Sequence, residues 1–207
     1  LRRALVLKAP DSRSSIWAHV MERDPLHWYR SIVIDAGSDR GVSLNDPVLG
    51  PRNGQLVAAG RIVDVRPKTS TVLLLTDEGA AVAAYLSSGT FEGLVQGQDG
   101  PSLRMNYLNA EVQLSTGDAV YTSPTSATFP PNVLIGHVAR VNARDPFLAF
   151  QSVEVSPAAD ASSLQELMIL RAALPEEAVV PRPARRRAPS VEVSTSAAAA
   201  APPEGPR

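Results

Sequence analysis

Two stretches of this 207-residue chain repeat one short pattern, and the repeat constrains the fold more than any other feature. Gly60–Val65 and Gly136–Val141 both read Gly-x-(Ile/Val)-x-x-Val, and a polar turn and an apolar segment follow each copy. Upstream, residues 45–48 resemble residues 117–120. The two matches are offset by 76 and 72 residues. Two copies of one β module explain this spacing better than a single continuous sheet.

Outside these matches lie short segments in which residues alternate between two faces, the period that is typical of strands. The clearest is the segment of residues 102–107, and another is Arg30–Asp35, where Arg30, Ile32 and Ile34 alternate with Ser31, Val33 and Asp35. Many short strands joined by Gly and Pro turns favour small closed barrels, because closure leaves no exposed sheet edge. The predicted fold is therefore all-β, with two small six-stranded barrels in tandem.

The predicted domains are residues 16–88 for the first barrel and 89–172 for the second, with the last apolar strand, Leu167–Leu170, assigned to either barrel. Residues 1–15 are the end of a helix or a loose arm. Leu1 and Leu5 are one helical turn apart, and a helix there would pair two chains through them. Residues 173–207 contain seven of the 18 prolines and no aromatic residue, which predicts a disordered tail. The arginine cluster within it indicates a solvated linker or a contact with anions such as lipid headgroups.

The repeated strands also predict which side chains face the core. Asp64 and Arg140 must point outward, which places Val63 and Val65 in one copy, and Ala139 and Val141 in the other, inside. Ile62 and Val138 would then share the outer face with the charges. They are predicted to be buried between the barrels or, alternatively, to bind a partner.

Composition excludes several classes of function. A net charge of −1 gives no reason to expect a nucleic-acid partner, and the absence of cysteine rules out disulfides and thiol chemistry. No window contains the ~18 consecutive apolar residues that a membrane-spanning helix needs. Because the chain begins at Leu1 rather than methionine, we expect a fragment from which an upstream membrane anchor is missing.

Residues for catalysis or for binding a cofactor are not evident. The chain has three histidines that could serve as a catalytic base, His19, His27 and His137, but no Gly-x-Ser-x-Gly nucleophile motif. The loop that most resembles an oxyanion-binding loop, Gly117–Ala119, has alanine at the nucleophile position. His137 lies in a predicted strand and is interpreted as structural. No metal-ligand spacing or phosphate-binding loop occurs, so we expect no metal, no cofactor and no enzymatic activity.

Trp28 and Tyr29 are adjacent aromatic residues that precede a predicted strand. They either pack on the barrel rim or form an interaction surface, since tryptophan and tyrosine are enriched at interface hot spots.

Several blocks together resemble the MreC family of rod shape-determining proteins. They are Arg23-Asp24-Pro25, Trp28-Tyr29-Arg30, Ile34-Asp35, Gly37-Ser38, Gly41-Val42, Val72–Asp77, and the ending Glu154-Val155-x-Pro157-Ala158-Ala159-Asp160 with Leu164. The resemblance covers about residues 14–171, with the blocks in the family's order.

The resemblance implies a protein of the bacterial inner membrane with a periplasmic part, made of a dimerising helix and two barrels arranged as in chymotrypsin-type proteases. It implies a non-enzymatic scaffold of the cell-elongation machinery that associates with itself, MreB, MreD, an elongation-class penicillin-binding transpeptidase and a RodA-type glycosyltransferase. A periplasmic adaptor of an export complex and a chymotrypsin-like hydrolase are the alternatives.

Overall fold

The computed structural model describes residues 14–88, 91–143 and 149–171. Their regular structure consists of strands β1 to β12 and one 3-10 turn, Ser38–Arg40. Among these residues, none forms a helix that is long and apolar enough to cross a membrane. The expected helix end with Leu1 and Leu5 and the expected disordered tail lie outside the described residues.

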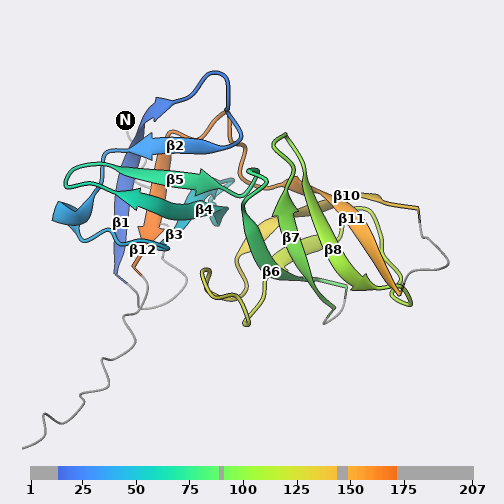
Figure 1. The fold of residues 1–207 in the computed structure, drawn as a ribbon. Helices are drawn as coiled ribbons and strands as arrows, with labels where there is room; N and C mark the ends of the chain where they lie inside the picture. Colours follow the sequence, from blue (N-terminus) through green and yellow to red (C-terminus); the bar gives the residue numbers. More distant parts are fainter. Residues whose placement is uncertain (1–13, 89–90, 144–148, 172–207) are drawn as a thin grey trace, which may run out of the picture. The chain divides into compact units, whose positions relative to one another are not determined.

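Six strands close into the first barrel, in the order β4-β3-β12-β1-β2-β5, and β5 pairs with β4 to complete the ring (Figure 1). The strands are β1 (Ser15–Arg23), β2 (Ser31–Ile34), β3 (Pro47–Arg52), β4 (Gln55–Val65), β5 (Ser70–Leu74) and β12 (Glu166–Leu170). Ile32, Ile34 and Val72 fill the interior and are fully buried. The alternation around Ile32 and Ile34 therefore identified a real core face.

The second barrel has the same construction, in the order β10-β9-β6-β7-β8-β11, and β11 pairs with β10 to close it. Its strands are β6 (Ala81–Leu86), β7 (Glu92–Gly97), β8 (Leu103–Asn109), β9 (Ala119–Thr122), β10 (Leu134–Val141) and β11 (Phe150–Pro157). The prediction of an all-β fold with two small six-stranded barrels is confirmed.

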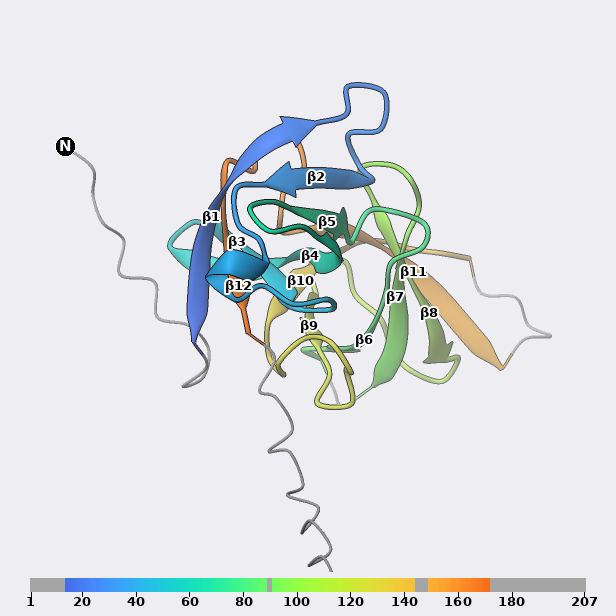
Figure 2. The same cartoon turned by 60° about the vertical axis from the view of Figure 1, so that its left-hand side comes forward.

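The second barrel is built from the consecutive strands β6 to β11, whereas the first barrel takes its sixth strand, β12, from the end of the described chain. After β5 the chain leaves the first barrel, and β6 pairs with β7 and β9 of the second. After β11 it returns, and β12 pairs with β1 and β3 of the first (Figure 2). The predicted boundary at residues 88 and 89 is therefore misplaced, because the chain crosses between Leu74 and Ala81. The composition break after Leu86 marks a turn within the second barrel.

An apolar contact joins the two barrels. Leu49 and Met168 are paired across β3 and β12 and belong to the same buried cluster as the interior of the second barrel. Their neighbours Val48 and Ile169 belong instead to the core of the first barrel. Both faces of this strand pair are thus buried, as in a sheet covered on both sides.

The repeated glycines allow a close approach between strands. A Cβ at Gly60 would lie 2.1 Å from the carbonyl oxygen of Leu73, and one at Gly136 would lie 2.1 Å from that of Ser156. Gly60 therefore lets β4, the middle strand of β3-β4-β5, lie close against β5. Gly136 does the same for β10, the middle strand of β9-β10-β11, against β11.

The predicted facing of the repeated strands was wrong at four positions. Ile62 and Val138 are buried inside the barrels, whereas Val63 is half-buried and Ala139 is exposed. The reason is a register shift immediately after Ile62 and after Val138, typical of a β-bulge. The extra residue changes which face the following side chains occupy, so the charge that follows it does not share a face with Ile62 or Val138.

Candidate partner-binding surface

A short loop between β1 and β2 presents the most exposed of the large hydrophobic side chains among the described residues. The Asp24 carboxylate accepts a hydrogen bond from the backbone N–H of Leu26 at 2.8 Å and contacts Nδ1 of His27 at 2.7 Å. The hydrogen bond with His27, followed by that from Leu26, lowers the pKa of Asp24 below its ordinary value. These contacts fold Asp24–His27 into a defined turn.

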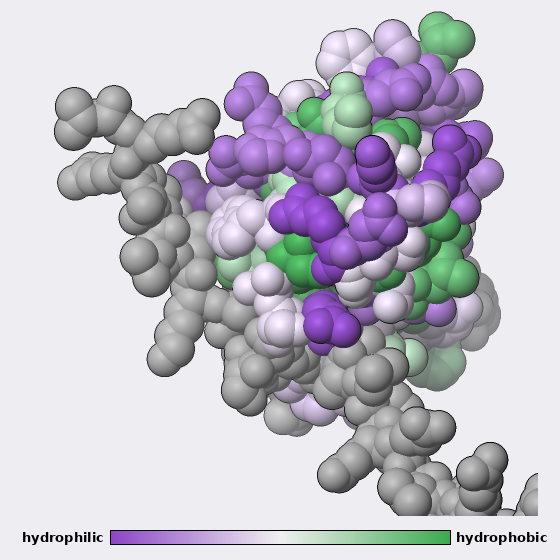
Figure 3. Space-filling model, turned by 90° about the vertical axis from the view of Figure 1, so that its left-hand side faces the viewer, coloured by the Kyte–Doolittle hydropathy of each residue, from purple (hydrophilic) through white to green (hydrophobic). Residues whose placement is uncertain are grey.

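The turn directs two apolar side chains into solvent. Leu26 is 85% exposed and Trp28 is 48% exposed, and we call this pair the apolar tip. The indole N–H of Trp28 donates to the carbonyl oxygen of Pro25, which fixes the ring without burying it. Figure 3 shows one side of the molecule, on which hydrophilic residues predominate and hydrophobic residues lie between them in separate areas.

Tyr29 differs from Trp28. It is half-buried and packs against the core of the first barrel, and its carbonyl oxygen accepts a hydrogen bond from Oγ1 of Thr76 at 2.5 Å. Tyr29 therefore lies on the barrel rim, whereas Trp28 is exposed to solvent.

Arg30 connects this loop to the second barrel. Its guanidinium donates to the carboxylate of Asp99, in the turn after β7, at 2.5 Å, and lies 3.7 Å from the carboxylate of Glu78. The side-chain hydrogen bond with Arg30, then the backbone N–H of Glu78, lowers the pKa of Asp99. The apolar tip therefore adjoins a charged contact between the barrels.

This charged contact predicts how stability depends on pH. Because the pKa of Asp99 is lower in the folded state, its contribution to stability is present above the unfolded value of ~3.9 and is lost as pH falls through the folded value. We expect Asp99→Asn to reduce the acid sensitivity of thermal unfolding below about pH 4. Melting curves from pH 2 to pH 7 test this, with Asp39→Asn as control. Identical pH profiles for Asp99→Asn and the unmodified protein would contradict it.

Other predicted site residues lie elsewhere. Ile62 and Val138 are barrel-core residues and offer no surface, because both are almost fully buried. Leu1 and Leu5 lie outside the described residues. Sequence reasoning missed Leu26, although an isolated leucine in a polar turn was an available signal. It also missed the pairing of Arg30 with Asp99, which are 69 positions apart and share no local pattern.

The histidines are not arranged for nucleophilic catalysis. His19 lies 3.3 Å from Asp35 and 3.5 Å from Glu166, and His27 contacts Asp24. Within the described part of the chain, no hydroxyl is hydrogen-bonded to a histidine ring, and no cluster of three metal-ligating side chains occurs. His137, interpreted as structural from the sequence, is exposed and points away from the core.

Two closed barrels, the first of which is completed by the returning strand β12, define the chain as an all-β double-barrel protein. A family model described as "Rod shape-determining protein MreC, barrel core" matches residues 20–171. The chain belongs to the MreC family, whose members are cell shape-determining proteins.

Individual relatives agree with this assignment. The cell shape-determining protein MreC of Caulobacter vibrioides is 32% identical over 102 residues, which cover 49% of this chain and 28% of that protein. MreC of Listeria monocytogenes has a solved structure with a TM-score of 0.69 and 26% identity, covering 77% of this chain and 76% of that chain. The chain spans only 28% to 63% of the length of the curated relatives.

Two further solved structures share the fold. One is the major periplasmic domain from the cell shape-determining filament MreC, with a TM-score of 0.63, 24% identity and coverage of 78% of this chain and 98% of that chain. The other comes from a complex between penicillin-binding protein PBP2 and MreC of Helicobacter pylori. It has a TM-score of 0.57 and 14% identity, and it covers 77% of this chain and all of that chain.

Proposed function

We propose that this chain is the periplasmic part of a non-enzymatic scaffold in the cell-elongation machinery, and that it binds an elongation-class penicillin-binding transpeptidase. Membership of the MreC family supports a role in cell shape, and the complex of a relative with PBP2 supports a partner of this class. The observation in this chain that carries the proposal is the apolar tip, which is held outward by a hydrogen-bonded turn.

The apolar tip has the properties of a docking element. Leu26 and Trp28 both expose apolar side chains to solvent, and tryptophan is enriched among the residues that dominate binding energy. Charged groups of Arg30, Asp99 and Glu78 lie beside it and supply a polar rim. Because hydrogen bonds hold the turn before any partner arrives, little conformational entropy is lost on binding.

Replacing Trp28 by alanine tests the proposal. We expect the affinity for the elongation-class transpeptidase of the same organism to fall at least thirtyfold, corresponding to the ~2 kcal/mol or more typical of a hot spot. Calorimetric titration measures the affinity. Leu44→Ala is a matched control, since Leu44 is 60% exposed but lies outside the loop. If Trp28→Ala leaves the affinity for the transpeptidase unchanged while Leu44→Ala lowers it, the interface does not lie at the apolar tip.

The remaining parts of the scaffold role belong to the same proposal. An upstream membrane helix would anchor the chain in the inner membrane, and self-association would be strengthened by a helix that includes Leu1 and Leu5. MreB, MreD and a RodA-type glycosyltransferase are the further proposed partners. The structural neighbour that is a periplasmic domain from a filament supports the proposed location and self-association.

A further inference from the structure

A polar hollow lies where the first barrel meets the second. The β3–β4 hairpin turns at Asn53 and Gly54, both with positive φ, as in the two-residue turns that suit twisted hairpins. Beyond the turn, Val57 of β4 pairs with Leu134 of β10 in the parallel bridge between the barrels. The hollow beside this bridge has a volume of about 510 Å³, within the range of small-molecule sites.

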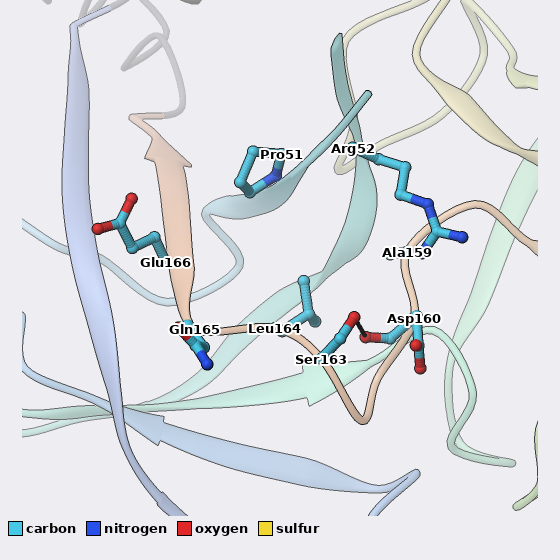
Figure 4. A pocket seen from close by; sticks show the side chains of 8 residues that line it. All are labelled: Pro51, Arg52, Ala159, Asp160, Ser163, Leu164, Gln165 and Glu166. Atoms are coloured by element: carbon cyan, nitrogen blue, oxygen red, sulfur yellow. Dashed lines mark hydrogen bonds between the residues drawn. The ribbon is translucent and has the colours of Figure 1, made fainter. Parts of the chain in front are cut away.

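Both barrels contribute to the lining. The hairpin supplies Arg52, Asn53 and Gln55, and the outer face of the second barrel supplies Tyr121 and His137. The remaining lining residues are Val57, Leu134, Ser156, Pro157 and Ala158. Arg52 also lines a smaller neighbouring hollow of about 180 Å³. Its side chain extends there toward Ala159 and Asp160 (Figure 4).

The polar side chains of the larger hollow are available to a ligand. Within the described residues, the side chains of Arg52, Asn53, Gln55 and His137 make no hydrogen bond or ion pair, and Arg52 only attracts the carboxylate of Asp160 at longer range. The described lining contains an arginine and a histidine but no aspartate or glutamate. Its chemistry therefore suits a ligand that accepts hydrogen bonds and carries negative charge.

An aromatic surface lies among these polar groups. Tyr121 is paired with Leu134 on one side and with Tyr85 on the other, and the two tyrosine rings stack with centroids 5.8 Å apart. A hydrogen bond from the Tyr85 hydroxyl to Asn132 at 2.6 Å holds this pair in place. A supported ring beside amide side chains, an imidazole and a guanidinium matches a sugar, which has an apolar C–H face and a rim of hydroxyl groups.

We propose that this hollow binds a saccharide that carries a carboxylate. Tyr121 contacts the C–H face of the sugar ring, the amides of Asn53 and Gln55 hydrogen-bond its hydroxyl groups, and Arg52 with His137 binds the carboxylate. The site is separate from the apolar tip and does not depend on the proposed transpeptidase contact.

Two disaccharides that differ in one group test the proposal. Cellobiouronic acid carries a carboxylate where cellobiose carries a hydroxymethyl group. With the full 207-residue chain, we expect cellobiouronic acid to shift the amide resonances of Asn53, Gln55, Tyr121 and His137 at millimolar concentration, and to bind at least tenfold more tightly than cellobiose. Equal affinity for both would overturn the carboxylate assignment. Absence of shifts at these residues would overturn the site.

Variants separate the roles of the lining residues. Arg52→Gln is expected to weaken the binding of cellobiouronic acid about tenfold while leaving cellobiose unchanged, because it removes only the charge-assisted contact. Arg104→Gln, at an exposed arginine on β8, is the matched control. Tyr121→Phe keeps the ring and should keep binding, whereas Tyr121→Ala should abolish it in protein with an unchanged amide spectrum elsewhere. Equal binding by a short acidic peptide, or full binding by Arg52→Gln, would overturn the proposal.

Discussion

Replacing Ile62 by aspartate is expected to unfold the first barrel. Ile62 is fully buried among Ile32, Ile34 and Val72, so the substitution loses the ~1.5–3 kcal/mol of a buried isoleucine and adds several kcal/mol for an unpaired carboxylate. The sum approaches the ~5–15 kcal/mol by which folded domains are stable. We expect loss of the cooperative thermal transition, measured by circular dichroism.

Two neighbouring substitutions make this prediction specific. Asp64→Asn should be nearly neutral, because Asp64 is exposed and its contact with Arg66 is a surface ion pair. Val63→Asp should lie between the two, since Val63 is half-buried in the bulge. If Val63→Asp is as damaging as Ile62→Asp, the bulge does not direct these side chains as described.

Gly97→Ala should have the second-largest effect, because it forces the crossing segment away from β7. A Cβ at Gly97 would lie 2.0 Å from the carbonyl oxygen of Asp77 and 2.5 Å from the carbonyl carbon of Thr76. Backbone cannot rotate aside as a flexible side chain can. Overpacking of this kind costs about 3 kcal/mol, which corresponds to a fall in Tm of about 10 °C.

Gly100 provides the matched control for this prediction. It lies three residues further along, and the nearest atom to a Cβ there would be the carbonyl oxygen of Gln98 at 3.7 Å. Gly100→Ala should therefore melt within about 2 °C of the unmodified protein, since surface substitutions usually change stability by less than ~0.5 kcal/mol. Equal melting temperatures for the two variants would show that the crossing segment is not held against β7.

The sequence predicted the fold class because the signals for it are local. Alternation around Ile32 and Ile34 depends on strand geometry alone, and the repeated glycines at Gly60 and Gly136 mark equivalent close approaches in the two barrels. The facing of Ile62 and Val138 was mispredicted because the extra residue of a bulge moves the side chains that follow it to the opposite face of the strand. Nothing in the composition of a single strand indicates such a bulge.

Long-range features were less accessible from the sequence. The assignment of β6 to the second barrel and the return of β12 to the first depend on pairing with strands that are distant in sequence, which the residues Ala81–Leu86 alone do not indicate. The candidate surface was predicted at Trp28 but not at Arg30 and Asp99, whose contact exists only once the barrels meet. The hollow lined by Arg52 and His137 likewise assembles from both barrels.

The returning strand β12 inverts the order in which the two barrels become complete during synthesis. All six strands of the second barrel lie between Ala81 and Pro157, so that barrel has its full set of strands while the first still lacks one. The first barrel, although it begins the chain, must wait for Glu166–Leu170 to emerge. Until then β1 and β3 each present an unpaired edge, a hazard for aggregation that ends only when translation reaches Leu170.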